Sequence, residues 1–223
     1  MYAMRPAALA DVEGITRVID LRCADLIRRH SIRNEANTIR SLMAQPGPFA
    51  QQVWVFTDET VPRAPYDTSD EAPVAGCLLL TDQVPHTALW SRQELAEPSL
   101  SLGHVYSHPG PAQSRVGWMM ACWALDHVAR TYPQAEWARC AVPHRRLLHL
   151  LRDRWGWTHI RSGTGADGTT VHLLQHRPET KPGLTTLIPT GPSALLGIPP
   201  TTDTPVGTPP QAHPLSASPW RHM

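Results

Sequence analysis

The 223-residue sequence lacks several features that would assign it to a class of protein at once. It has four cysteines but no C-x-x-C pair, and therefore neither a zinc-ribbon nor a dithiol redox motif. Lys and Arg number 20 against 19 Asp and Glu, so there is no basic excess to bind nucleic acid. No apolar run approaches the roughly 18–20 residues that span a bilayer, and the N-terminus lacks the apolar core of a signal peptide. We therefore expect a cytoplasmic protein with buried, reduced cysteines that binds neither nucleic acid nor membrane.

Proline is unevenly distributed, and its excess is concentrated at the end of the chain. Residues 178–223 contain 11 prolines, four charged residues and one aromatic residue, Trp220. The apolar residues of this segment show no clear helical or strand period, so it cannot bury enough surface to offset its ordering entropy. We therefore predict a folded domain at residues 1–177 and a disordered tail at 178–223. Recruitment of a partner by a proline-rich motif in the tail is the alternative.

The folded part mixes the hydrophobic periods of strands and helices. Followed along the chain, these periods predict a strand, two helices, three strands, a helix, a strand, a helix and two strands. The expected strands lie at 4–7, 53–57, 74–81, 100–107, 137–142, 158–161 and 171–176. The expected helices lie at 11–27, 34–43, 115–131 and 145–154, with a further helical turn at 91–95. This order is typical of a mixed α/β domain rather than of strict βαβ alternation.

Three local sequences, together with this order, resemble the GNAT acetyltransferase superfamily. The chain opens with Met4-Arg5-Pro6-Ala7 followed by Asp11, residues 105–129 read VYSHPGPAQSRVGWMMACWALDHVA, and residues 152–157 read RDRWGW. They are similar to the superfamily's first strand and helix, its cofactor motif and the end of its last helix. The resemblance implies a twisted, mostly antiparallel mixed sheet flanked by helices and splayed at the cofactor cleft. It also implies an N-acetyltransferase that moves an acetyl group from acetyl-CoA to an amine of a small molecule or a peptide.

The loop that enters the helix at 115–131 is suited to hold the pyrophosphate of CoA. A helix start offers backbone N–H groups without partners and the positive end of the helix dipole. Gly117 leaves room for phosphates close to the backbone, and Arg115 adds a cation. The expected cofactor-binding residues are Gln113, Ser114, Arg115, Val116, Gly117 and Trp118, to which the resemblance adds Val105, Tyr106 and Ser107 from the preceding strand. The alternative is an ordinary loop with an ordinary first-turn glycine.

The candidate catalytic residues are His104 and Tyr106 on the strand before this loop. Acetylation of an amine needs a base, and histidine side chains titrate near neutral pH. Tyr106 either lines the acceptor site or packs in the core, and His108 is either a second base or the start of a turn. His104 and His108 lie four residues apart, a spacing that joins two metal ligands on a helix but not across a strand end. We therefore expect no metal.

Two positions depart from the superfamily's pattern. Aligning Gly117 with the last glycine of the cofactor motif puts Arg115 at the first, where its side chain either contacts the pyrophosphate or crowds it. Arg152 stands four residues before Gly156, where many members have a tyrosine that protonates the departing thiolate. Water or another group then has to supply that proton. The alternative is a binding or regulatory module that has lost turnover.

Three further features stay open at the level of sequence. The basic residues of 144–146 are either a solvated face or contacts for the 3′-phosphate of CoA. In the superfamily the acceptor is set by segments that correspond here to 32–43, 82–98 and 143–146, and these show no specificity signature. The protein is either a monomer or, as many members are, a homodimer.

Overall fold

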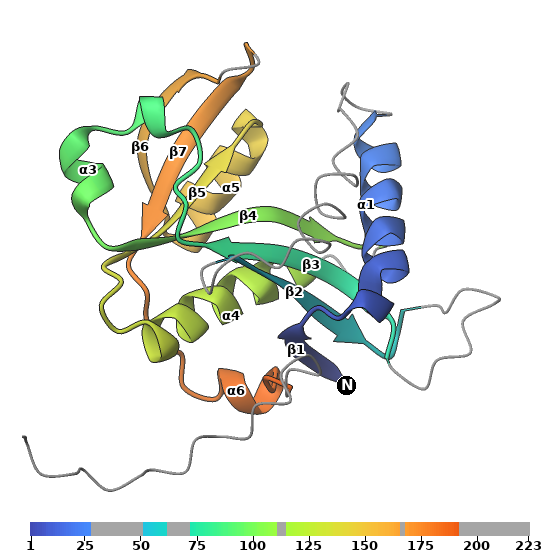
Figure 1. Ribbon diagram of the computed structural model, residues 1–223. Coiled ribbons are helices and arrows are strands. Elements are labelled where there is room, and N and C mark those ends of the chain that lie inside the picture. The colour runs from blue at the N-terminus through green and yellow to red at the C-terminus, as the bar shows by residue number, and fades with distance from the viewer. Residues whose placement is uncertain (28–50, 62–71, 111–114, 166–167, 192–223) are drawn as a thin grey trace, which may run out of the picture.

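The structure is a computed structural model that describes residues 1–27, 51–61, 72–110, 115–165 and 168–191. Within these ranges one seven-stranded sheet has the order β1-β2-β3-β4-β5-β7-β6, antiparallel throughout except between β4 and β5 (Figure 1). The strands are β1 (Tyr2–Pro6), β2 (Gln51–Asp58), β3 (Val74–Thr81), β4 (Ser99–Ser107), β5 (Trp137–Val142), β6 (Thr158–Thr164) and β7 (Thr170–His176). The helices are α1 (Val12–Ile27), α3 (Arg92–Ala96), α4 (Val116–Thr131), α5 (Arg145–Trp155) and α6 (Leu184–Leu187), with 3₁₀ turns η1 (Leu9–Asp11) and η2 (Thr87–Leu89).

The predicted mixed α/β class is confirmed, and the described strands and helices lie close to their predicted bounds. The end of α5 follows from Gly156, which adopts the left-handed conformation (φ 73°) that favours glycine after a helix. The helix expected at 34–43 lies outside the described residues. Within the described ranges, no helix is both long enough and apolar enough to cross a bilayer. All four cysteines are free thiols, and three of them are buried.

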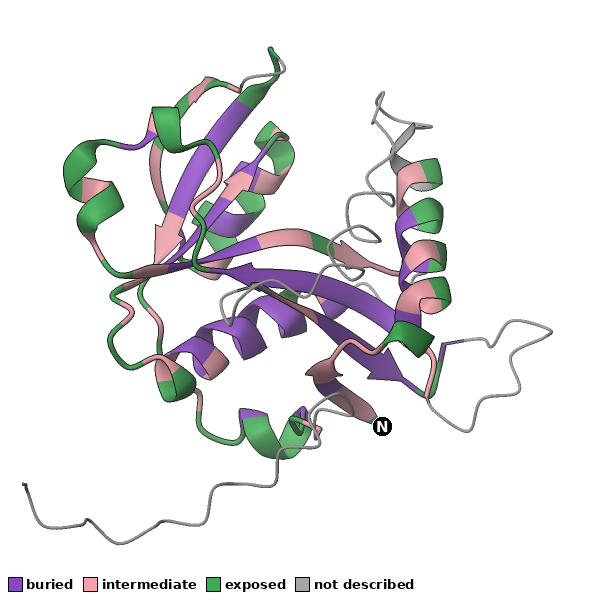
Figure 2. Ribbon diagram, viewed as in Figure 1, coloured by how far each residue is buried: buried purple, intermediate pink, exposed green. Residues whose placement is uncertain are grey.

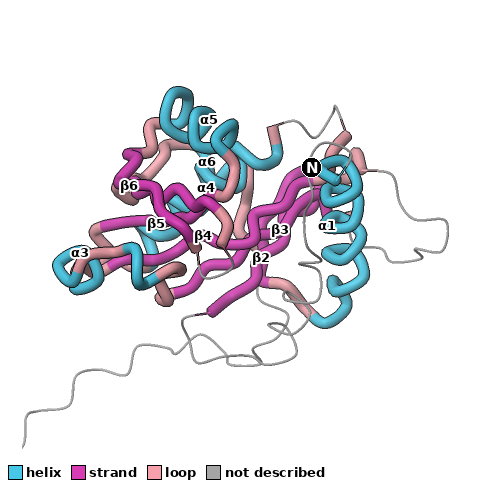
Figure 3. Tube along the Cα trace, turned by 90° about the horizontal axis from the view of Figure 1, so that it is seen from above, coloured by secondary structure: helices cyan, strands magenta, loops and turns pink. Residues whose placement is uncertain are grey.

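Helices cover both faces of the sheet, so its central strands are buried on both sides (Figures 1, 2 and 3). On one face α1 packs its Ile15 and Ile19 against Cys77 of β3. On the other face α4 and α5 enclose the main core, which includes the next residue, Leu78. Adjacent residues of a strand point to opposite faces, which explains why β3 reads as a continuous apolar run.

The strands β4 and β5 run side by side only over part of their length. Residues 99–102 of β4 pair in parallel with residues 137–140 of β5. Beyond this point β4 pairs only with β3 and β5 only with β7, and the two strands diverge (Figure 1). The predicted splay of the sheet is therefore confirmed.

A β-bulge lies where β4 begins to diverge. Gly103 pairs with Leu79 and Tyr106 with Cys77, so two residues of β4 oppose the single Leu78 of β3. His104 lies in this bulge with φ 49°, in the left-handed region that few non-glycine residues adopt. The bulge therefore sets the direction of the free end of β4.

The segment that follows β7 corrects the predicted start of the tail. Residues 178–191 form a strap that crosses α4 and reaches β1, with Leu184 and Ile188 buried in the main core. Met4 donates its N–H to Pro189 and accepts a hydrogen bond from Gly191, which adds a short parallel bridge to the edge of the sheet. The prediction of disorder from residue 178 was wrong for residues 178–191. The edge strand β1 supplies hydrogen-bond partners for this segment, and the composition of the segment alone could not indicate them. Residues 192–223 lie outside the described residues.

Candidate functional site

The first turn of α4 presents backbone donors that the helix itself does not use. The amide of Met119 bonds to the carbonyl of Arg115 at 2.9 Å, and the amides of Val116, Gly117 and Trp118 precede this bond. Arg115 is the N-cap residue, and its side chain makes no capping hydrogen bond. The turn therefore combines N–H groups that make no hydrogen bond within α4 with the positive end of a long helix dipole.

Gly117 keeps the space beside these donors open. Among the described residues, a Cβ atom built on Gly117 would meet only one heavy atom within 4 Å outside its own helix and neighbours, the Oγ of Ser107 at 3.9 Å. No packing within the described protein therefore requires glycine at this position. A phosphate group can approach the backbone closely only where no side chain fills the space. The first turn of α4 leaves such a space, so these residues fit a CoA pyrophosphate.

The end of β4 forms the second wall of the site. Beyond Leu102 this strand has a neighbour on one edge only among the described strands, which leaves the other edge of residues 103–107 available. Val105 is 44% exposed there, and Ser107 lies against Gly117. The structure thus brings the predicted strand residues and the start of α4 together.

Arg22 of α1 belongs to the same site, and no pattern in the sequence indicated its role. Its Nε donates to the carbonyl oxygen of Ser107 at 3.0 Å, and its Nη2 donates to the Ser107 Oγ at 2.6 Å. The guanidinium thereby holds the last residue of β4 beside the first turn of α4. The two residues are 85 positions apart, so no local pattern could have linked them.

The remaining cofactor-binding predictions divide into three groups. Trp118 is 44% exposed, whereas Val116 is buried and can offer only its backbone. Arg115 is exposed. Gln113 and Ser114 lie outside the described residues.

The candidate catalytic residues occupy different surroundings on β4. His104 is half-buried in the bulge. Tyr106 is half-buried and packs against the cluster of Ile15 and Cys77 beneath α1, the core position that was the alternative to an acceptor-site role. His108 starts the turn after β4, since its Nδ1 accepts a hydrogen bond from the amide of Gly110 at 3.1 Å. Burial, and then the charges of Arg17 and Arg22, lower the pKa of His108.

Arg152, in the position where the resemblance expects a tyrosine, lies on the surface. Its Nε donates to Asp153 at 2.6 Å, and its Nη2 contacts the Nδ1 of His149 at 3.1 Å. No tyrosine replaces it among the described residues of α5. Protonation of a leaving thiolate from this helix position would therefore need water.

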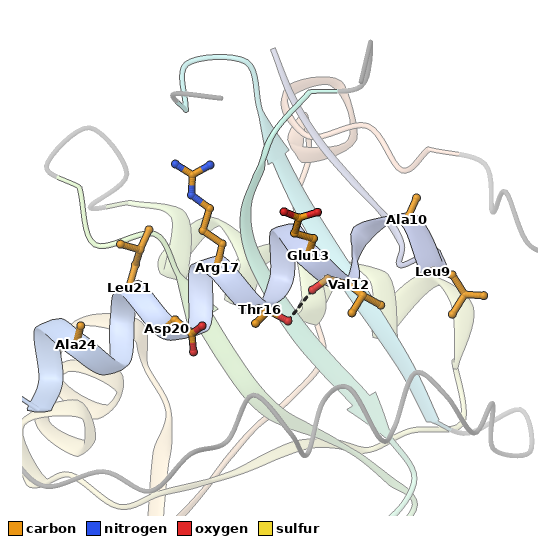
Figure 4. Close-up of a pocket in the computed structure, with 9 residues that line it drawn as sticks. All are labelled: Leu9, Ala10, Val12, Glu13, Thr16, Arg17, Asp20, Leu21 and Ala24. Carbon is orange, nitrogen blue, oxygen red and sulfur yellow. Dashed lines mark hydrogen bonds between the residues drawn. The ribbon is translucent and has the colours of Figure 1, made fainter. Parts of the chain in front are cut away.

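A broad hollow of about 870 Å³ lies along the outer surface of α1 (Figure 4). Its described lining carries mixed charges, with Glu13 and Asp20 against Arg17, and includes none of the predicted site residues. In the described part of the chain, no three His, Cys, Asp or Glu side chains are grouped so as to hold a metal ion. The described lining of the hollow therefore adds no catalytic group to the site.

A histidine cluster lies at the opposite end of the sheet, on β6 and β7. The Oγ of Ser162 is 2.6 Å from the Nδ1 of His172 and 3.0 Å from the Nε2 of His159. Burial lowers the pKa of His172, and the charges of His159, Arg145 and His149 lower it further. Burial also lowers the pKa of His127, whose ring stacks on Trp123, although Asp126 opposes this effect.

These lowered pKa values predict that acid destabilises the fold. Above about pH 6.5 the histidines His108, His127 and His172 are neutral in both the folded and the unfolded chain. As the pH falls below that value, the unfolded chain takes up protons that the folded chain does not. Stability is therefore lost, and the loss levels off below the folded-state pKa values. Carboxyl groups with lowered pKa values, such as Asp126, lose their contribution only nearer pH 4.

Urea unfolding between pH 7.5 and 5.0 measures this effect. We expect the free energy of unfolding to fall through this range, and the fall to be shallower in a His172→Asn variant, which keeps a hydrogen-bonding group near Ser162. Equal slopes for the two proteins would exclude His172 as a source of the pH dependence.

No protein-family model matches the sequence, and no curated protein matches it. Solved structures do match. A Desulfovibrio desulfuricans protein described as an acetyltransferase of the GNAT family has 12% identity and a TM-score of 0.57, over 80% of this chain and 100% of that one. Arabidopsis thaliana NAA60 in complex with acetyl-CoA has 12% identity and a TM-score of 0.54, over 79% and 98% of the two chains. Spermidine N-acetyltransferase from Vibrio cholerae, in complex with CoA and spermine, has 11% identity and a TM-score of 0.50, over 79% and 95%. With the splayed sheet and its flanking helices, these likenesses identify the fold of this chain as that of the GNAT acetyltransferases.

Proposed function

We propose that this protein is an N-acetyltransferase that uses acetyl-CoA to acetylate an amine of a small molecule or a peptide. The observation that carries the proposal is the open first turn of α4 beside the end of β4, whose edge toward β5 has no partner among the described strands. The solved structures of similar fold support it, because two of them contain acetyl-CoA or CoA and one also contains a polyamine. The four free thiols agree with a reducing compartment such as the cytoplasm.

Named groups of this chain would hold the co-substrate. The amides of Val116, Gly117 and Trp118 would bind the pyrophosphate, with Arg115 as a nearby cation. The free edge of residues 105–107 would bind the pantetheine arm through its backbone groups. When bound, acetyl-CoA supplies an acetyl group activated as a thioester.

The chain's own residues would then handle the protons. His104 would accept a proton from the acceptor amine as its nitrogen forms the new C–N bond, and backbone N–H groups of β4 would polarise the acetyl carbonyl. Tyr106 would border the acceptor on the α1 side. Water would protonate the departing thiolate, since the side chain of Arg152 is engaged by Asp153 at the surface.

Two departures from the superfamily's pattern favour a second candidate function, a CoA-binding module without turnover. Arg152 replaces the expected tyrosine, and Arg115 replaces a glycine of the cofactor motif. Both changes leave the cradle of α4 in place. Binding would then persist where catalysis is lost.

Titration calorimetry with acetyl-CoA tests the cradle through Gly117. A Gly117→Glu variant places a carboxylate where the phosphates would bind, and we expect its affinity to fall at least about 100-fold. Gly117→Ala is the matched control, because its Cβ would lie 3.9 Å from the nearest heavy atom outside its helix. We expect Ala to weaken binding by no more than about tenfold.

The outcomes separate the candidates. Release of free CoA thiol with any member of an amine panel supports the transferase, and binding without release on the whole panel supports the module. A parent protein with a folded circular-dichroism spectrum that does not bind acetyl-CoA would overturn both.

A further inference from the structure

The turn that follows β4 lies close to one side of α1. A Cβ atom built on Gly14 of α1 would be 2.9 Å from the Cγ2 atom of Val74, so the helix approaches the start of β3 closely. The next residue of β3, Ala75, accepts a hydrogen bond from the amide of His108 at 2.8 Å. The first two residues of β3 therefore bring His108 and this side of α1 together.

Arg17 extends from this side of α1. It follows Gly14 by three residues, a spacing that puts two side chains on the same face of a helix. Figure 4 shows Arg17 and Leu21 on one side of α1 and Asp20 on the other. The side chain of Arg17 is exposed, and it makes no hydrogen bond or ion pair with any described residue, Glu13 one turn before it included. Its guanidinium therefore keeps its hydrogen-bond donors for a ligand.

His108 presents a further donor beside Arg17. Its Nδ1 accepts a hydrogen bond from the amide of Gly110 at 3.1 Å, so the proton of the neutral ring is on Nε2. No described residue accepts a hydrogen bond from this Nε2–H group. Burial, and then the charges of Arg17 and Arg22, lower the pKa of His108, which favours the neutral ring near neutral pH. Arg17, Arg22 and His108, which we call the donor rim, thus combine positive charge with N–H groups.

The donor rim lies on the side of the sheet that α1 covers. Arg22 joins it to β4 through the two hydrogen bonds to Ser107. The cradle belongs to α4, which packs on the opposite face (Figure 1). Residues 99–110 contain no Asp or Glu that would oppose an anion there. A ligand on the donor rim therefore approaches β4 from the side of Tyr106, where the acceptor would bind, and not from the first turn of α4.

We propose that the acceptor carries an anionic group, such as a carboxylate, besides its amine, and that the donor rim binds this group. The inference rests on the proposed function, because it names the class of acceptor for the same site. His104 would take the proton of the amine, and His108 lies four residues further along the chain, which is roughly 13 Å of extended strand. The amine and the anionic group of the acceptor are therefore separated by roughly 10–13 Å.

Three amines of equal chain length test the preference for an anion. They are 8-aminooctanoate, 8-aminooctanamide and 1,8-diaminooctane, which differ only in the charge at the end away from the reacting amine. We expect kcat/KM for the carboxylate to exceed the other two values about tenfold at low salt, mainly through a lower KM. The preference should shrink between about 0.05 M and about 0.5 M salt, because exposed charges are screened.

An Arg17→Gln variant tests the donor rim with the same three amines. We expect the ratio of kcat/KM between 8-aminooctanoate and 8-aminooctanamide to fall from about ten to about two or less, through a higher KM for the carboxylate. Arg92→Gln is the matched control, an exposed arginine on α3, and should keep the full ratio. Titration calorimetry with acetyl-CoA and circular dichroism check that both variants are folded and bind the co-substrate.

The anionic acceptor and the proposed function fail in different ways. Equal kcat/KM for the three amines, an unchanged ratio in Arg17→Gln, or acetylation of other amines but not of 8-aminooctanoate would each overturn the anionic acceptor and leave the proposed function standing. Weaker binding of acetyl-CoA by Arg17→Gln would assign the donor rim to the co-substrate and would also overturn it. A parent protein that binds acetyl-CoA but acetylates no amine of the panel, these three included, would overturn both.

Discussion

Removing residues 178–223 is expected to lower the free energy of unfolding by about 3–5 kcal/mol. Removing only residues 192–223, whose proline-rich composition predicts disorder, is expected to change it by less than about 0.5 kcal/mol. The difference in the free energy of unfolding between the two truncated proteins measures how much the strap contributes to stability. It also tests where the folded domain ends, which the sequence placed at residue 177.

The expected loss follows from what the strap buries and bonds. Ile188 is fully buried and Leu184 nearly so, and burial of each such side chain contributes about 1.5–3 kcal/mol. The indole N–H of Trp123 donates to the Oγ1 of Thr190 at 3.2 Å, and the amide of Lys181 donates to Asp126 at 2.6 Å. Without the strap these core residues are exposed to water and the edge of β1 loses its cover.

Urea unfolding of the full chain, of residues 1–191 and of residues 1–177 provides the comparison. An Ile188→Ala variant of the full chain is the point control, with an expected loss of about 2–4 kcal/mol from the cavity that it leaves. If residues 1–177 were as stable as residues 1–191, the strap would rest on the domain without stabilising it.

The strap shows where sequence reasoning reached its limit. Composition over the whole of residues 178–223 predicts disorder, because prolines dominate the average. Leu184 and Ile188 are nevertheless four residues apart, the spacing of one helical turn, and this local signal was available. What the sequence could not show is that β1 presents a free edge at that point.

The elements that were predicted well are those with strong local patterns. The bounds of β3 and β5 agree with the prediction, because each is a largely apolar segment bounded by turn residues. The splayed sheet followed from the resemblance and not from any local pattern. The contact between Arg22 and Ser107 joins residues far apart in the chain, so only the fold reveals it.

A buried arginine was the other feature that the sequence did not reveal. The pattern of β5 placed Arg139 in a strand, where an alternating arginine normally faces water. Instead its side chain is fully buried on the face that residues 82–98 cover. Its Nη1 donates to the carbonyl of Glu94 at 2.5 Å, and its Nη2 donates to the carboxylate of Glu97 at 2.6 Å. The guanidinium also lies 4.7 Å from the ring centre of Trp90.

Replacing Arg139 by alanine is expected to lower the free energy of unfolding by about 3–5 kcal/mol. The substitution leaves a cavity and removes the partner of Glu97 and of the Glu94 carbonyl at the same time. Burial lowers the pKa of Arg139, while Glu97 and Glu94 oppose this effect. Arg161→Ala is the matched control, because Arg161 also pairs with Glu94 but is 43% exposed. An exposed pair contributes no more than about 1 kcal/mol.

Urea unfolding of the two variants decides whether burial or charge pairing anchors the segment over β5. A large loss for Arg139→Ala and a small one for Arg161→Ala would show that the buried guanidinium anchors residues 90–97 to the sheet. Equal losses would show that the two ion pairs act alike and that burial adds nothing. An Arg139→Met variant then separates the cavity from the lost hydrogen bonds. Since methionine fills much of the same volume, any loss that remains measures the hydrogen bonds to Glu94 and Glu97.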